Sequence, residues 1–209
     1  MVSPVLKPGM RSVNAYFPAG KWFNLFNYSM AVNTSAGRYV TLDAPDDSIN
    51  VHVRGGSILV MQDEANTTRQ ARESGYELVV ALDEFGNATG DVFMDDGDVL
   101  EMGVNQSEWS LIRFTSRIEG DSVVVDSNVV NGTYAQDHQM LVKKVVFLGL
   151  KPESNQNRTT AMFVNGRMLR ESEASYGRRG RFDVAEIRGL SHYIGKDFEL
   201  KLKLRSQPK

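Results

Sequence analysis

The densest group of residues able to do chemistry is the acidic run Asp95-Asp96-Gly97-Asp98. Several carboxylates on a tight glycine turn can bind a hard cation such as calcium. The spacing differs from that of an EF-hand loop, and strand-like segments flank the run. A β-turn in which Gly97 adopts a positive φ is therefore the favoured interpretation, and a calcium loop is the alternative.

The same carboxylates are poorly placed to act as a catalytic acid and nucleophile. A pair that cleaves a glycosidic bond must flank the sugar ring with its carboxyl groups about 5–10 Å apart. Asp95 and Asp96 are neighbours at the end of a predicted strand, so their side chains point to opposite faces. We expect no catalytic residue in this chain.

Other catalytic and cofactor-binding patterns are also missing. His52, His138 and His192 are scattered and form no zinc-binding motif. The chain contains no cysteine, and no serine lies in a Gly-X-Ser-X-Gly elbow. Gly55-Gly56 lacks the lysine and the following helix of a phosphate-binding loop. We therefore expect no metal and no other cofactor.

Aromatic residues offer a possible binding surface. Tyr16 and Trp22 lie in the segment richest in aromatics, and Trp109 opens a later predicted strand. Their rings could stack on sugars, or they could pack into a core or against a neighbouring domain, as large aromatic side chains commonly do. The packing interpretation is favoured, and the carbohydrate platform stays open.

N-glycosylation sequons are unusually frequent. They occur at Asn27, Asn33, Asn66, Asn87, Asn105, Asn131 and Asn157. The Asn, Ser and Thr content alone predicts about 1.6 sequons. The absence of cysteine on its own favours a reducing compartment, but the excess of sequons outweighs it. We expect a secretory-pathway protein, in the extracellular space, the cell wall or the vacuole, although residues 1–9 lack the features of a signal peptide.

Charge and hydropathy exclude two classes of partner. The formal net charge is −2 and the pI is about 6.0, so there is no basic field for a nucleic acid. No apolar run approaches the roughly 20 residues of a membrane-spanning helix, so we expect no membrane partner.

The elements that must position these residues are strands. Residues 198–204 alternate strictly between apolar and charged, and residues 111–118 and 122–126 read as a hairpin around Gly120. Residues 49–54 also alternate, and residues 57–60 follow the Gly55-Gly56 pair. Residues 76–82 and 142–148 are apolar runs of strand length. The best helical window, residues 63–72, is too polar to bury a face.

Many short strands at this spacing predict an all-β fold with two antiparallel β-sandwich modules in tandem. The polar stretch 61–75 separates the first set of strands from the second. We place the module boundary there, so that the second module has about 130 residues, an ordinary sandwich size.

Several stretches, in this order, resemble the C-terminal end of glycoside hydrolase family 31, the α-glucosidase and α-xylosidase family, and most closely its plant members. The matching stretches are Val2-Ser-Pro-Val-Leu6, Val13-Asn-Ala-Tyr-Phe-Pro18 with Trp22-Phe23, Val53-Arg-Gly-Gly-Ser-Ile-Leu59, Leu82-Asp83-Glu84 and Gly90-Asp-Val-Phe-Met-Asp-Asp-Gly-Asp98.

The resemblance implies a particular domain organisation. In that family a (β/α)₈ barrel carries an Asp nucleophile and an Asp acid/base, and a proximal and a distal β-sandwich follow it. Residues 1–12 then correspond to a remnant of the barrel exit segment, residues 13–75 to the proximal sandwich and residues 76–209 to the distal one.

The resemblance also implies what this chain does not do. The family's nucleophile motif, a Trp-hydrophobic-Asp-Met-Asn-Glu run, is absent from the sequence, as is its acid/base segment. The chain alone is therefore predicted to be inactive and to stabilise the barrel of a parent hydrolase; the alternative is a carbohydrate-binding module. We further expect an exposed apolar patch around the N-terminal segment, which would make the isolated chain prone to association.

Overall fold

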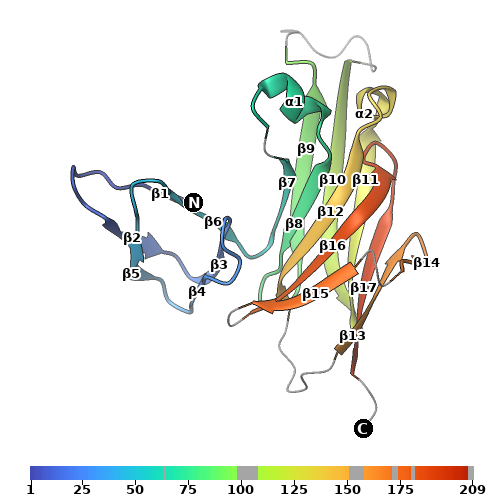
Figure 1. Ribbon diagram of the computed structural model, residues 1–209. Coiled ribbons are helices and arrows are strands. Elements are labelled where there is room, and N and C mark those ends of the chain that lie inside the picture. Colours follow the sequence, from blue (N-terminus) through green and yellow to red (C-terminus); the bar gives the residue numbers. More distant parts are fainter. Residues whose placement is uncertain (64, 98–107, 151–157, 171–173, 180–181, 207–209) are drawn as a thin grey trace.

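The computed structural model describes residues 1–63, 65–97, 108–150, 158–170, 174–179 and 182–206, and these residues lie mostly in strands (Figure 1). The all-β prediction and the arrangement of two modules in tandem are confirmed. The first module contains β1 (Val2–Ser3), β2 (Ser12–Phe17), β3 (Gly20–Asn24), β4 (Ala31–Thr34), β5 (Arg38–Asp43) and β6 (Asn50–Arg54).

The second module contains the remaining described elements, two of which are short helices. They are β7 (Ser57–Gln62), α1 (Thr68–Glu73), β8 (Tyr76–Ala81), β9 (Ala88–Asp95), β10 (Trp109–Glu119), β11 (Ser122–Asn131), α2 (Thr133–Asp137), β12 (Leu141–Leu150), β13 (Arg158–Val164), β14 (Arg167–Met168), β15 (Ala174–Arg179), β16 (Phe182–Tyr193) and β17 (Glu199–Ser206).

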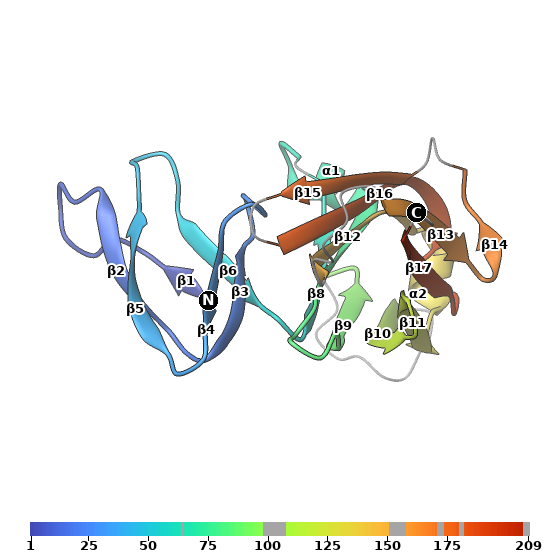
Figure 2. The same cartoon turned by 90° about the horizontal axis from the view of Figure 1, so that it is seen from below.

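The first module is a small two-layer sandwich. One sheet has the order β1-β6-β3-β4, and the other is the pair β2-β5. Side chains from both sheets meet in a core that includes Phe17, Trp22, Val32 and Leu42. Figure 2 shows the β2-β5 pair lying across from the larger sheet.

The second module is one sheet of described strands that folds over on itself. Its order is β14-β13-β17-β11-β10-β9-β7-β8-β12-β16-β15. Strands β7 and β9 meet at a single register pair, Ser57 with Thr89, where the sheet turns the corner. Figure 2 shows β8, β12 and β16 on one side and β9, β10 and β11 on the other. The core between these layers includes Leu78, Phe114, Phe147 and Leu202.

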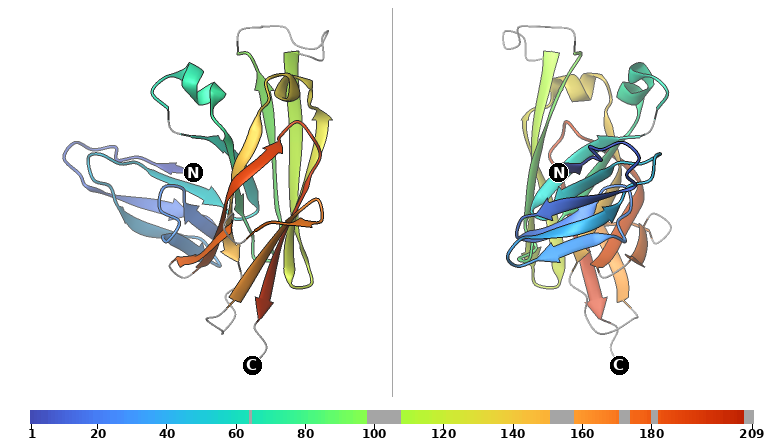
Figure 3. Two further views of the ribbon diagram at one scale, coloured as in Figure 1. Left: turned by 45° about the vertical axis from the view of Figure 1, so that its right-hand side comes forward. Right: turned by 90° about the vertical axis from the view of Figure 1, so that its left-hand side faces the viewer.

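Strands β8 and β12 are buried on both faces, which explains why their sequences are apolar runs without alternation. One face looks into the second module's own core. The other packs against the first module, where Phe23 and Val53 meet Val79, Ala81 and Val146. Figure 3 shows from two sides how the first module covers this layer. The two strands pair in parallel, so the second module is not purely antiparallel.

The boundary between the two modules, as defined by hydrogen bonding within the sheets, lies N-terminal to the polar stretch 61–75. Strand β7 begins before that stretch, yet it pairs with β8 from Ser57–Ala81 to Gln62–Tyr76 and belongs to the second module's sheet. Sheet membership therefore changes at Gly55-Gly56. Within residues 1–12, β1 pairs with β6 and is part of the first module's sheet. The assignment of residues 1–12, 13–75 and 76–209 to barrel exit, proximal and distal domains stays a prediction.

The helices contribute little to the core. Helix α1 lies within the predicted helical window as far as Arg72, begins at an N-cap where Thr67 Oγ1 accepts a 3.2 Å bond from the Gln70 amide, and buries no residue. Helix α2 buries Tyr134 and Ala135 and was not expected. Within the described part of the chain, neither helix has the length and apolar composition needed to cross a membrane.

Candidate functional site

The acidic run lies at the end of β9, where Asp95, Asp96 and Gly97 form a turn. The Gly97 amide donates a 3.0 Å bond to Asp95 Oδ1, and Gly97 has a φ of 74°. The Asp96 carbonyl accepts a 2.7 Å bond from Arg72. This geometry confirms the predicted positive φ of Gly97; Asp98 lies outside the described residues.

The three histidines lie apart and in different surroundings. His52 is 3% exposed, with its ring edge-on to Phe17 at 4.9 Å between centroids. His192 packs edge-on against Phe198, also at 4.9 Å. Burial lowers the pKa of both rings. His138 is exposed, and its Nδ1 lies 2.9 Å from the carbonyl of Tyr134. In the regions that the structure describes, no group of three or more His, Asp or Glu side chains is arranged to hold a metal ion.

The structure separates the three candidate sugar-stacking aromatics. Trp22 is only 7% exposed and its Nε1 donates a 2.9 Å bond to the Pro18 carbonyl, so its ring faces are not open to a sugar. Tyr16 is half exposed and lies 5.2 Å from the ring of Tyr39. Trp109 stacks on exposed Phe93 with ring planes 15° apart. Tyr16 and Trp109 belong to different modules and form no common platform.

The sequons also fall into distinct classes. Asn27, Asn33, Asn66 and Asn87 are exposed. Asn131 is half-buried, its amide nitrogen donates a 2.9 Å bond to the Trp109 carbonyl, and its oxygen accepts from Thr133. Asn105 and Asn157 lie outside the described residues.

The two modules approach one another at backbone distance beside Gly55. A Cβ atom at this position would lie 2.8 Å from the Leu82 carbonyl oxygen, so only glycine fits here. The Gly55 amide donates to the Lys21 carbonyl and the Gly56 amide to the Ala81 carbonyl, both at 2.8 Å. The Gly-Gly pair thus links the first module's sheet to the second.

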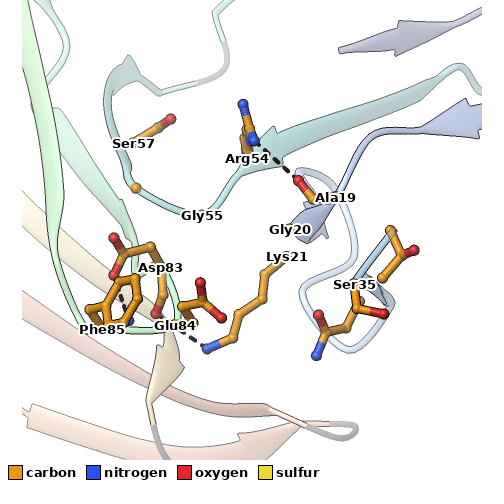
Figure 4. Close-up of a pocket in the computed structure, with 13 residues that line it drawn as sticks. Ala19, Gly20, Lys21, Ser35, Arg54, Gly55, Ser57, Asp83, Glu84 and Phe85 are labelled. Carbon is orange, nitrogen blue, oxygen red and sulfur yellow. Dashed lines mark hydrogen bonds between the residues drawn. The ribbon is translucent and has the colours of Figure 1, made fainter. Parts of the chain in front are cut away.

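An open cavity of about 980 Å³ lies at this junction, and we call it the junction pocket. Its lining comes from four segments and is mostly polar: residues 19–21 and 33–35 of the first module, residues 54–57 of the link, and Asp83, Glu84 and Phe85 in the turn after β8. Figure 4 shows Lys21 reaching from the first module toward that turn, where its Nζ donates a 3.2 Å bond to the Asp83 carbonyl.

Charged residues border the apolar contact between the modules. Tyr28 of the first module donates a 3.3 Å bond to Glu77 of β8. Lys144 of β12 lies 3.0 Å from both Glu77 and Glu186. Burial opposes the charge on Lys144, but hydrogen bonds to the two carboxylates raise its pKa above the ordinary value.

Exposed apolar side chains are concentrated in the first module. Nine of the fifteen large apolar side chains exposed among the described residues lie within the first 54 residues. They are Met1, Val2, Leu6, Met10, Tyr16, Phe26, Met30, Tyr39 and Ile49, and Leu6 is the most exposed at 87%. Scattered exposed apolar residues are normal, but the first 54 residues contain nine of them and the later described residues only six.

The junction pocket was not foreseen from the sequence. Two of the stretches that carried the family resemblance, at residues 53–59 and 82–84, meet at this pocket. They meet because β7 pairs with β8, which places Ser57 opposite Ala81. Strand pairing joins segments that are distant in the sequence, so neither stretch on its own indicates the contact.

A family model and two relatives of known sequence match this chain and agree on its family. Residues 1–59 match the model of the glycosyl hydrolase family 31 C-terminal domain. A protein of Oryza sativa subsp. japonica named probable alpha-glucosidase is 44% identical over 97% of this chain and 24% of the relative. An alpha-glucosidase of Hordeum vulgare is 43% identical over 98% of this chain and 24% of the relative. The chain thus spans about a quarter of the length of these relatives.

A solved structure extends the likeness to the fold. The chain superimposes on the crystal structure of a glucosidase II alpha subunit with a TM-score of 0.77 and 20% identity, over 98% of this chain and 22% of that one. At this identity the comparison bears on the fold alone, and it covers both modules.

Proposed function

The chain belongs to glycosyl hydrolase family 31 as part of its C-terminal region, and we propose that it is a non-catalytic packing partner that stabilises the catalytic (β/α)₈ barrel of an α-glucosidase-like hydrolase. The parent enzyme would hydrolyse O-glycosyl bonds in carbohydrate metabolism.

The observation that carries this proposal is the apolar surface of the first module, defined by the nine exposed side chains above. Five of these come from the residue before β1, from β1 itself, from the loop that follows it and from the approach to β6; they are Met1, Val2, Leu6, Met10 and Ile49. Strand β1 is also an edge strand, with a side open to further contacts. A surface of this composition is stabilised when a neighbouring domain covers it.

The proposal can be tested by co-expressing this chain with the catalytic portion of the Hordeum vulgare alpha-glucosidase, its own C-terminal quarter removed. We expect the two to co-purify and the chain to raise the yield of soluble hydrolase activity. Leu6→Asp should abolish co-purification, because it places a charge on the apolar surface. The matched control Val130→Asp, at a half-exposed site on β11, should leave it intact.

Two results would contradict the packing role. One is a chain that is monodisperse, binds no hydrophobic dye and fails to associate with the catalytic portion. The other is co-purification that Leu6→Asp and Val130→Asp affect equally.

A second candidate function, carbohydrate binding, is favoured by one feature of β9 and β10. Phe93 is 49% exposed and stacks nearly parallel to Trp109 at 5.9 Å, which places a partly exposed aromatic pair on the second module. Isothermal titration with maltose or xyloglucan fragments tests it. Binding heat that Phe93→Ala abolishes would support the module, and no heat at millimolar ligand would eliminate it.

We also propose that the protein passes through the secretory pathway to the extracellular space, cell wall or vacuole. The support is the excess of sequons and the exposure of Asn27, Asn33, Asn66 and Asn87. Enzymatic removal of N-glycans should increase the gel mobility of the protein from its native source. Unchanged mobility and an intact mass equal to that of the bare polypeptide would contradict the proposal.

A further inference from the structure

One sequon lies in the wall of the junction pocket. Asn33, Thr34 and Ser35 make up a complete sequon, and all three line this cavity. Asn33 is exposed on β4, the edge strand of its sheet. It pairs across the strands with Lys21, so both side chains project from the same face. Since Lys21 reaches Asp83 across the pocket, a group attached to Asn33 would extend in the same direction.

An exposed aromatic ring stands on the opposite wall. Phe85 is 69% exposed in the turn after β8. The turn is held in place by Asp83, whose Oδ1 accepts 2.8 Å bonds from the amides of Phe85 and Asn87. The ring is therefore presented by a braced turn at the edge of a polar cavity. A concave site with one aromatic face and several polar groups has the composition of a site for a polar organic ligand such as a sugar.

We propose that the junction pocket holds the N-linked glycan carried by Asn33, with its inner sugars packed between β4 and the ring of Phe85. This inference rests on the proposed passage through the secretory pathway. There, oligosaccharide is transferred from a lipid diphosphate donor: the bond from sugar C1 to the diphosphate oxygen breaks, C1 bonds to Asn33 Nδ2, and the amide loses one proton.

The location has two physical consequences. A glycan on β4 covers the open edge of its sheet and blocks pairing with another chain. A glycan that also contacts the turn after β8 bridges the two modules, because Asn33 and Phe85 belong to different ones.

The test uses the 209-residue chain secreted from a eukaryotic host, with Asn27 as the internal control, since it is exposed in the same module and outside the pocket lining. Glycopeptide mass spectrometry measures occupancy and the rate at which an N-glycosidase removes each glycan from the native protein. We expect release at Asn33 to be slower than at Asn27 by about 2- to 10-fold, the range of a single aromatic contact. After denaturation the two rates should converge.

Variants identify the contact. Phe85→Ala should raise the native release rate at Asn33 by about 2- to 10-fold and leave Asn27 unchanged. Met168→Ala, which removes an exposed apolar side chain outside the pocket lining, should change neither rate. An Asn33 without glycan, equal native rates at the two sites, or no response to Phe85→Ala would overturn the inference while glycan at Asn27 still supports secretion. A chain without glycan at either site would contradict both proposals.

Discussion

At the scale of single residues, buried His52 and half-buried His192 show how imidazole rings pack in the interior. His52 Nδ1 and His192 Nε2 are buried, and neither has a hydrogen-bond partner among the described groups. A proton on either ring would place a charge in apolar surroundings. Their role in this structure is therefore packing, and neither belongs to a site that could do chemistry.

His52 should make stability sensitive to acid. Burial, and secondarily the positive charge of the Met1 amino group, lower the pKa of His52 below 6.5 in the folded chain. As the pH falls through 6.5, His52 is protonated in the unfolded chain but stays neutral in the folded chain. The free energy of unfolding therefore decreases. Denaturant titrations at pH 7.5 and 5.5 should show this loss, and His52→Gln should reduce the difference between the two pH values. His138→Gln, at an exposed site, is the control, and an equal reduction by both variants would contradict the assignment.

Lys144 illustrates a charge held at the border of the contact between modules. Lys144→Met removes the cation that lies 3.0 Å from Glu77 and Glu186 and leaves two half-buried carboxylates near each other. We expect the free energy of unfolding to fall by about 1–3 kcal/mol. Lys143→Met, the exposed neighbour, should change it by less than about 0.5 kcal/mol. Denaturant titration measures the free energy of unfolding of both variants. Equal decreases would show that the ion pairs of Lys144 do not stabilise the fold.

At the scale of elements, β12 shows how an irregularity in one strand makes room for the other module. Gly149 has a φ of 81° and lies where the pairing register of β12 with β16 shifts. A Cβ at Gly149 would lie 2.8 Å from the ring of Phe23. The bulge thus lets the Phe23 side chain of the first module approach the backbone of β12.

Gly149→Ala is expected to destabilise the chain by about 2–4 kcal/mol, through a strained positive φ and the collision with Phe23. Gly166→Ala provides a matched control. Gly166 has a similar φ of 76°, and a Cβ there would meet no atom within 4 Å, so it should cost only about 1 kcal/mol of strain. Thermal unfolding measures how much each variant is destabilised. Because both replace a glycine of similar φ, the difference between them is due to the contact of the Cβ added at Gly149 with Phe23. Equal destabilisation would mean that Phe23 moves aside without cost.

At the scale of the whole molecule, the apolar contact between the modules joins them into one unit. Phe23 is fully buried in it, and β8 and β12 would expose their outer faces without it. We therefore expect the two modules to unfold in one cooperative transition.

The chain supplies its own probes for this prediction, because its two tryptophans, Trp22 and Trp109, lie in different modules. Trp22→Phe and Trp109→Phe leave one fluorescent reporter each, and their denaturant midpoints should coincide. Adding Phe23→Ala should cost about 3–5 kcal/mol and separate the two midpoints. Distinct midpoints before Phe23 is changed would show that the modules are thermodynamically independent.

Much of the local structure of this protein follows from short stretches of its sequence. Alternation over residues 111–126 predicted the β10–β11 hairpin, and the positive φ predicted for Gly97 is present in the structure. Period-two patterns and turn residues act over a few neighbouring positions, so they can be read without knowing what lies across the sheet. Edge strand β4 and helix α2 were missed, because four or five residues carry too little periodicity.

Which surfaces are covered follows from the three-dimensional packing of the chain and not from local sequence patterns. Hydrogen bonding of β7 to β8 placed the change of sheet at Gly55-Gly56. The two-layer core of the first module buried Trp22 and left Tyr16 half exposed. Packing of the first module on the second brought Asn33 and Phe85 to the same pocket. The physical reason is that burial depends on groups distant in the sequence. An apolar strand has the same local pattern whether its second face meets solvent, a core or another module, and the free energy of covering that face belongs to the assembled molecule.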